Sequence, residues 1–166
     1  KGVQIQMVNN REFNTLAEKY MDMIFRLAYS NLRSQSDADD VTQNVLLALY
    51  RSKKEFESEA HVKNWLAKVT VNECRRIWRM PWAKHENIDD YESSLKFEDQ
   101  SHRELFEAVM RLDKNKRTAV VLHYIEGYSL KEIAQLTGVP VGTVGTRLSR
   151  AREELKGFLT EGEKEI

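Results

Sequence analysis

A group of hydroxyl and guanidinium side chains recurs near the C-terminal end of the chain at the spacing of an α-helix. Its members are Thr143, Thr146, Arg147, Ser149 and Arg150. Arginine can hydrogen-bond the edge of guanine in a DNA major groove or grip a phosphate, and small hydroxyl side chains fit beside it. Apolar residues at steps of four, three and four positions alternate with this group, namely Val144, Leu148, Ala151 and Leu155. The pattern predicts a helix that buries the apolar residues and turns Thr146, Ser149 and Arg150 outward, with Thr143 and Arg147 on the flank.

The residues before this helix predict a helix-turn-helix. Ser129 and Glu132 form a capping box that starts a first short helix. Gly138 supplies the turn, and Pro140 presets the first turn of the second helix. The alternative is an ordinary helical hairpin with a solvated polar face. Two glycines inside the second helix each cost about 1 kcal/mol relative to alanine, and they are Gly142 and Gly145. Such glycines usually permit the close approach of another backbone.

A second row of polar side chains lies in the N-terminal half of the chain. The polar row consists of Asn64, Lys68, Asn72, Arg75 and Arg79, which follow one another at helical steps. At 1.5 Å per residue the row is about 22 Å long, enough to track a phosphate backbone, and asparagine can hydrogen-bond a base edge. The alternative is a solvated charged face. Because its charges have a single sign, the row favours a nucleic-acid surface.

Phe56 is an isolated aromatic residue in the charged stretch RSKKEFESEAH. It either anchors this stretch to the domain or lines a pocket for an unstacked base. We expect one broad apolar face on the helix that follows, made of Val62, Trp65, Leu66, Val69 and Ile77. Val71, Cys74 and Trp78 occupy much of the remaining circumference, so we expect this helix to be buried nearly all round except along the polar row.

The composition restricts the class of protein. Charged residues make up 31% of the 166 residues and sum to zero net charge, so any nucleic-acid binding must come from local clusters. No apolar run approaches the roughly 18 residues of a membrane span, and we expect a soluble, cytoplasmic protein without membrane insertion. With Cys74 as the single cysteine, we expect no intrachain disulfide, no metal site and no cofactor. No nucleophile stands beside a base, so we expect no catalytic residues and no enzyme activity.

The elements that position these residues are predicted to be helices, because apolar residues recur at helical spacing almost throughout. We expect helices over 10–32, from Ser36 to near 52, over 61–80, from Ser101 to 113 and over 116–126, followed by the helix-turn-helix. Ser36 with Asp39 and Ser101 with Glu104 are the expected start signals. The acidic segment 81–100 lacks periodicity and reads as a flexible linker. The predicted fold class is therefore all-α, with two small helical domains at 8–80 and 101–162.

Three stretches of the chain, in this order, resemble the sigma-70 family of bacterial RNA polymerase initiation factors. They are DADDVTQNVLLALY at 37–50, WLAKVTVNECRR at 65–76 and YSLKEIAQLTGVPVGTVGTRLSRAREEL at 128–155. The match is to the extracytoplasmic-function (ECF) group, which keeps only sigma domains 2 and 4, and it covers about 13–159. The resemblance implies a sigma factor that binds core RNA polymerase, recognises the minus-35 and minus-10 elements of promoter DNA and helps to open the duplex.

The resemblance also implies roles for individual residues. Polymerase binding falls to Asp40, Gln43 and Asn44, on a helix that docks on the clamp helices of the largest subunit; family members more often have glutamate at position 44. The implied minus-10 residues are Phe56, Asn64, Lys68, Asn72, Arg75, Arg76 and Arg79. Among them, Asn72 would contact an unpaired base, Phe56 its pocket, and the arginines the backbone. The implied minus-35 residues are Thr143, Thr146, Arg147, Ser149 and Arg150.

The remaining implied features concern partners. The polymerase flap and an anti-sigma factor are further expected partners, and the acidic linker would thread the RNA exit path, although a merely solvating tether fits its composition equally well. Many relatives have lysine or arginine where this chain has Gly145. This chain should therefore differ from them in its grip on minus-35 DNA, or in its base preference, at that point. A free-standing repressor or response-regulator output domain is the competing interpretation, but such a protein has no use for the polar row.

Overall fold

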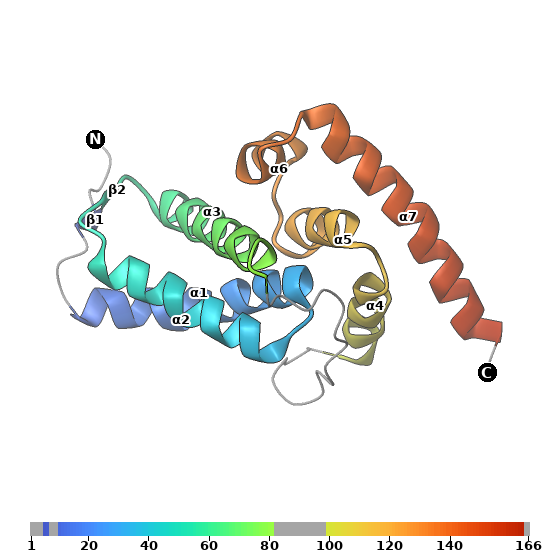
Figure 1. Ribbon diagram of the computed structural model, residues 1–166, viewed down its shortest axis with the longest axis horizontal. Coiled ribbons are helices and arrows are strands. Elements are labelled where there is room, and N and C mark those ends of the chain that lie inside the picture. Colours follow the sequence, from blue (N-terminus) through green and yellow to red (C-terminus); the bar gives the residue numbers. More distant parts are fainter. Residues whose placement is uncertain (1–4, 7–9, 82–98, 165–166) are drawn as a thin grey trace. The chain divides into compact units, whose positions relative to one another are not determined.

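The computed structural model describes residues 5–6, 10–81 and 99–164. These residues form two compact units, one before and one after the segment 82–98 in the sequence (Figure 1). The linker expected at 81–100 therefore lies almost wholly outside the described residues. Apart from one pair of two-residue strands, every regular element in the described ranges is helical. The all-α fold class is thus confirmed.

The N-terminal unit is built from three helices, α1 (Asn10–Leu32), α2 (Gln35–Arg51) and α3 (Glu59–Trp78). α1 packs against both α2 and α3. The largest fully buried side chains of this unit are Ile24, Leu27, Tyr29, Val41, Leu49, Phe56 and Leu66. Strands β1 (Ile5–Gln6) and β2 (Glu55–Phe56) pair antiparallel beside the helices. The helix predicted at 10–32 matches α1 at both ends.

The start of α2 differs from the sequence-based expectation. The capping residue is Ser34, whose hydroxyl accepts the backbone N–H of Asp37 at 3.3 Å, and Ser36 lies inside the first turn. Arg33 has a φ of 53°, so α1 ends in a left-handed residue and the next residue is already extended. The cap is therefore fixed by the reversal of the chain after α1, which the S-x-x-D pattern does not reveal.

The C-terminal unit contains α4 (Gln100–Met110), α5 (Lys114–Val120), the π-helical segment η1 (Val121–Ile125), α6 (Leu130–Thr137) and α7 (Val141–Lys164). α7 packs against α4, α5 and α6 (Figure 1). The largest fully buried side chains here are Phe106, Leu112, Leu122, Ile133 and Leu148. The long C-terminal helix is thus the scaffold that holds the other three.

Two predicted elements of this unit begin elsewhere. α4 is capped by Asp99, whose carboxylate accepts the N–H of His102 at 2.9 Å, while the Ser101 hydroxyl donates to the same carboxylate instead of capping. The helix predicted at 116–126 begins earlier, at Lys114, because Asp113 caps it. It then widens into η1, a π-helical segment whose backbone hydrogen bonds span five residues instead of four. One residue is thereby inserted relative to an α-helix. Apolar periodicity cannot distinguish that insertion from a regular α-helix.

The helix-turn-helix is formed by α6 and α7. Ser129 accepts the N–H of Glu132 at 3.2 Å, and the Glu132 carboxylate accepts the N–H of Ser129 at 2.8 Å, so the predicted capping box is confirmed. Gly138 ends α6 with a left-handed φ of 72°. The Pro140 carbonyl then accepts the N–H of Thr143 at 3.0 Å in the first turn of α7. These local contacts fix how the second helix leaves the turn.

Gly138→Ala is expected to lower the free energy of unfolding of the C-terminal unit by about 1–2 kcal/mol, because alanine at a positive φ clashes with its own backbone. Gly157→Ala is the matched control. Gly157 is exposed within α7 and a Cβ there meets nothing within 4 Å, so alanine should stabilise the unit by about 1 kcal/mol. Urea unfolding followed by circular dichroism measures the free energy of unfolding of each variant. Equal effects of the two substitutions would contradict a requirement for glycine at position 138.

Candidate nucleic-acid interfaces

The outer face of α7 has the arrangement that the sequence predicts. Val144, Leu148 and Ala151 are at most 1% exposed and form the inner side of the helix. The residues expected to point outward, Thr146, Ser149 and Arg150, are all exposed, and the flanking Thr143 and Arg147 are half-buried. The Thr146 hydroxyl donates to the carbonyl of Gly142 at 3.0 Å, one turn earlier. α7 therefore presents hydroxyl and guanidinium groups on one accessible face.

Gly142 and Gly145 are not required by packing within the unit. A Cβ at Gly142 would meet nothing within 4 Å, and one at Gly145 would meet only Leu130 Cδ2, at the ordinary contact distance of 3.7 Å. Gly142 lies one turn before Thr146, on the outer face. The sequence predicts that these glycines permit the close approach of another backbone. No backbone of the described part of this chain occupies that space.

The polar row of α3 is accessible along its C-terminal half. Asn72, Arg75 and Arg79 are exposed, while Asn64 and Lys68 are half-buried. The Arg79 guanidinium donates to the carbonyl of Arg75 at 3.3 Å, where it also complements the C-terminal end of the helix. The row is therefore a surface rather than a part of the core.

α3 is buried over a narrower part of its circumference than expected: Val71 and Cys74 are buried as predicted, but Trp78 is only half-buried. The fully or almost fully buried residues are Val62, Leu66, Ala67, Thr70, Val71 and Cys74. Three residues expected to be buried with Val62 and Leu66, namely Trp65, Val69 and Ile77, are only half-buried. Small side chains, Ala67, Thr70 and Cys74, thus make up half of the buried side of α3.

Phe56 is fully buried. Its ring meets Trp65 edge-to-face at 5.5 Å and His61 at 5.3 Å between centroids. His61 Nδ1 accepts the backbone N–H of Glu57 at 3.1 Å, and Ser58 caps α3. These contacts match the anchoring alternative: Phe56 ties the charged loop to the domain, and the ring is covered.

A contact between α1 and α3 sets the position of the loop. The Glu59 carboxylate pairs with Lys19 and accepts the hydroxyl of Tyr20 at 3.1 Å. The hydrogen bond from Lys19 lowers the pKa of Glu59, and the hydrogen bond from Tyr20 makes a smaller contribution in the same direction. Burial, with help from Glu59, raises the pKa of Tyr20 to about 12.

Because the pKa of Glu59 is depressed in the folded state, its contribution to stability is present above the ordinary value of 4.5 and is lost as the pH falls through the folded value. Glu59→Gln should therefore destabilise the N-terminal unit at pH 7, and the difference from wild type should shrink as the pH is lowered below 4.5. Urea unfolding at a series of pH values tests this, with the exposed Glu57→Gln as control. A difference that stays constant as the pH falls would contradict the assignment.

The exposed face of α2 contains Asp40, Gln43 and Asn44. Leu47, which the sequence analysis did not select, is 46% exposed and continues the same face one turn further along. We call these four residues the docking face. Three of the four side chains are polar, and Leu47 is apolar.

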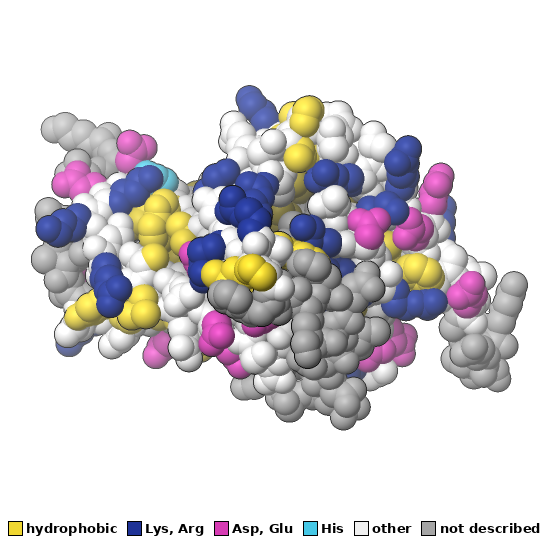
Figure 2. All heavy atoms as spheres, viewed as in Figure 1, with side chains coloured by type: hydrophobic (Ala, Val, Ile, Leu, Met, Phe, Trp, Pro, Cys, Tyr) yellow, Lys and Arg dark blue, Asp and Glu magenta, His cyan; other side chains and the backbone are white. Residues whose placement is uncertain are grey.

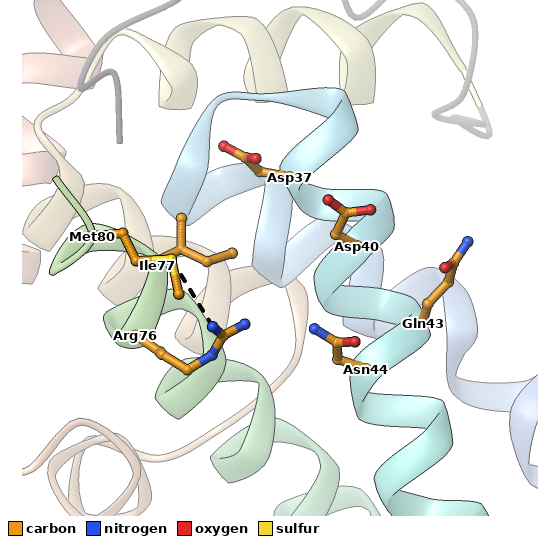
Figure 3. Close-up of a pocket in the computed structure, with 7 residues that line it drawn as sticks. All are labelled: Asp37, Asp40, Gln43, Asn44, Arg76, Ile77 and Met80. Atoms are coloured by element: carbon orange, nitrogen blue, oxygen red, sulfur yellow. Dashed lines mark hydrogen bonds between the residues drawn. The ribbon is translucent and has the colours of Figure 1, made fainter. Parts of the chain in front are cut away.

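A groove of about 350 Å³ lies between α2 and the C-terminal end of α3. It is lined by Asp37, Asp40, Gln43, Asn44, Arg76, Ile77 and Met80 (Figure 3). Arg76 is exposed but is paired with Glu73, at 3.1 Å between Nη2 and Oε2. Glu73 and Arg76 stand at i,i+3 on α3, a spacing that allows such a pair, but the sequence does not show that Asn44 of α2 shares the same carboxylate.

Charges of both signs are distributed over the two units. In Figure 2 the visible face of each unit carries Lys and Arg side chains with Asp and Glu among them. Among the described residues, no group of His, Cys, Asp and Glu could hold a metal ion. No described helix is both long enough and apolar enough to cross a membrane.

Comparisons with known proteins agree on one family. The family descriptions "Sigma-70 region 2" and "Sigma-70, region 4" match residues 16–92 and 102–155. The ECF RNA polymerase sigma factor SigM of Mycobacterium tuberculosis is 32% identical over 157 residues, covering 90% of this chain and 80% of that protein. The ECF RNA polymerase sigma-E factor of Haemophilus influenzae is 27% identical, covering 92% and 90%.

A solved structure has the same fold. The sigma factor RpoE of Bartonella quintana, crystallised with the anti-sigma factor NepR, superposes with a TM-score of 0.68 at 22% identity over 90% of this chain and 98% of that one. Region 2 matches the N-terminal unit, which holds the polar row, and region 4 matches the C-terminal unit, which holds α7. The chain belongs to the sigma-70 family, among the ECF RNA polymerase sigma factors.

Proposed function

We propose that this sigma factor recognises its promoters with two helix surfaces that act at once, α7 on duplex DNA and the polar row of α3 on separated strands. The family consists of transcription initiation factors that direct core RNA polymerase to promoters. The observation that carries the proposal is the exposure, in each of the two units, of one helix face that carries polar and arginine side chains. The zero net charge fits this role, because the polymerase supplies nonspecific attraction to DNA.

The minus-35 element is read by α7. Thr146, Ser149 and Arg150 face the major groove, and Arg150 hydrogen-bonds a base edge while Arg147 holds phosphate. Thr143 flanks the contact. At Gly142 a Cβ would meet nothing within 4 Å among the described residues, so its absence leaves room for DNA to approach the helix backbone closely.

The minus-10 element is opened by α3. Asn72 hydrogen-bonds a base that is accessible only after unpairing, and Arg75 and Arg79 hold the backbone beside it. Asn64 and Lys68 extend the contact toward the start of the helix. Extruding a base costs a few kcal/mol, which binding to polymerase and to the two DNA elements offsets. The buried Phe56 supports this surface by fixing the loop before α3.

The docking face of α2 binds the clamp helices of the polymerase. Asp40, Gln43 and Asn44 supply the polar contacts, and Leu47 supplies an apolar one. The C-terminal unit binds the polymerase flap, and an anti-sigma factor restrains the protein by covering these surfaces. We infer that the protein acts in the cytoplasm by binding alone, without catalysis of its own.

Run-off transcription with purified core polymerase and genomic promoter fragments tests this function. The expected result is transcripts that require both the core enzyme and this protein. Footprinting distinguishes the competing repressor: a repressor protects its site alone, whereas this protein should protect promoters only when core polymerase is added.

A further inference from the structure

One carboxylate oxygen connects α2 and α3 beside the docking face. Glu73 Oε2 accepts hydrogen bonds from Asn44 Nδ2 at 3.4 Å and from Arg76 Nε and Nη2 at 3.3 and 3.1 Å. On its other side Arg76 Nη1 lies 4.0 Å from the Met80 sulfur, as the dashed line in Figure 3 marks. The guanidinium is therefore held toward the groove between α2 and α3 by contacts on both sides.

The charge of this groove does not suit DNA. Of the side chains that line it, Asp37 and Asp40 bring carboxylates from α2, while Arg76 is the one cation (Figure 3). The charge of Arg76 is already balanced by Glu73. The groove is thus left with an excess of negative charge, which repels phosphate and attracts the basic side chains of a protein.

We propose that Arg76 belongs to the polymerase-binding surface and that Glu73 is the positioning residue that places it there. This replaces the minus-10 role that the family resemblance implies for Arg76, and it rests on the proposed function. The groove is continuous with the docking face, because both include Asp40, Gln43 and Asn44. The polymerase element that docks on α2 therefore extends over the groove and meets Arg76, while the polar row remains with DNA.

Arg76→Ala and Arg75→Ala form a matched pair, since they remove the same side chain from adjacent positions. Two affinities are measured: that of the labelled full-length protein for core polymerase, and that of the assembled holoenzyme for single-stranded minus-10 DNA from a promoter active in run-off assays. Arg76→Ala should weaken core binding about tenfold and change DNA binding less than about twofold. Arg75→Ala should do the reverse. Unchanged core binding by Arg76→Ala, or a loss on DNA instead, would overturn the proposal.

The role of Glu73 is tested by a double-mutant cycle for core binding. Glu73→Ala should cost at least as much as Arg76→Ala, because it releases both Arg76 and Asn44. The double variant should lose nothing beyond Glu73→Ala, because the guanidinium is already misplaced in that variant. Glu73→Gln keeps an acceptor oxygen and should restore part of the affinity, which a general loss of folding would not allow. Additive losses would rule out positioning by Glu73. If the wild type itself failed to bind core polymerase, the proposed function would fall, and not this inference alone.

Discussion

Asn72→Ala is expected to reduce the yield of open promoter complexes by about 10- to 100-fold, while initial binding of the closed promoter by holoenzyme changes little. The reason is that the base contacted by Asn72 is presented only after unpairing, so its hydrogen bonds stabilise the open state alone. Hydrogen bonds from an amide side chain to a base are worth about 1–3 kcal/mol, or about 5- to 150-fold, and the expected loss lies within these limits. Permanganate reactivity of minus-10 thymines measures opening, and gel-shift titration of the same duplex measures binding.

Asn64→Ala provides the graded control for this experiment. Asn64 lies on the same row, about 12 Å toward the start of α3 at 1.5 Å per residue, and its side chain is half-buried. We expect a smaller effect on opening. An Asn72→Ala variant that loses closed-complex binding and opening to the same degree would contradict a contact made only with separated strands.

Arg150→Ala is expected to weaken minus-35 recognition by about 1–3 kcal/mol, or about 5- to 150-fold, at the one base pair that it contacts. Discrimination at that pair should be lost together with affinity, because a side chain that reads a base edge supplies both. The measurement is promoter binding by holoenzyme across a set of single-base minus-35 variants. Unchanged discrimination would remove Arg150 from the base contacts.

Arg152→Ala is the matched control for Arg150. Its guanidinium donates to the hydroxyl of Tyr124 at 2.8 Å. Two residues along a helix is about 200° of rotation, so Arg152 points away from the outer face. Its removal takes the same charge from the same helix and should leave discrimination among minus-35 variants intact.

The helices could be predicted from the sequence where one apolar face stays in register over many residues. α1 is the clearest case, since both of its ends match the prediction. The starts of α2 and α4 could not be predicted, because several residues near each start can cap a helix. In α2 the choice depends on the left-handed Arg33, and in α4 on the carboxylate of Asp99. Such turn geometry is not encoded in periodicity.

The candidate surfaces were predictable to the same extent and for the same reason. Helical spacing was enough to place Thr146 and Arg150 on an exposed face and Leu148 on a buried one. Helical spacing also allows the i,i+3 pair of Glu73 and Arg76. It does not show that Asn44 of α2 shares the Glu73 carboxylate, or that Phe56 is buried against Trp65. Those contacts join different elements, so the role of Arg76 could be argued only from the structure.

The central claim is that the two surfaces hold one promoter together, and it is tested by probing a single complex at both elements. Holoenzyme on a linear promoter fragment is treated in parallel with DNase I and with permanganate. We predict protection of the minus-35 duplex and reactive thymines at minus-10 in the same complexes, with Arg150→Ala weakening the first signal and Asn72→Ala the second. Protection at minus-35 without any opening at minus-10, or opening that is indifferent to Asn72, would contradict the account.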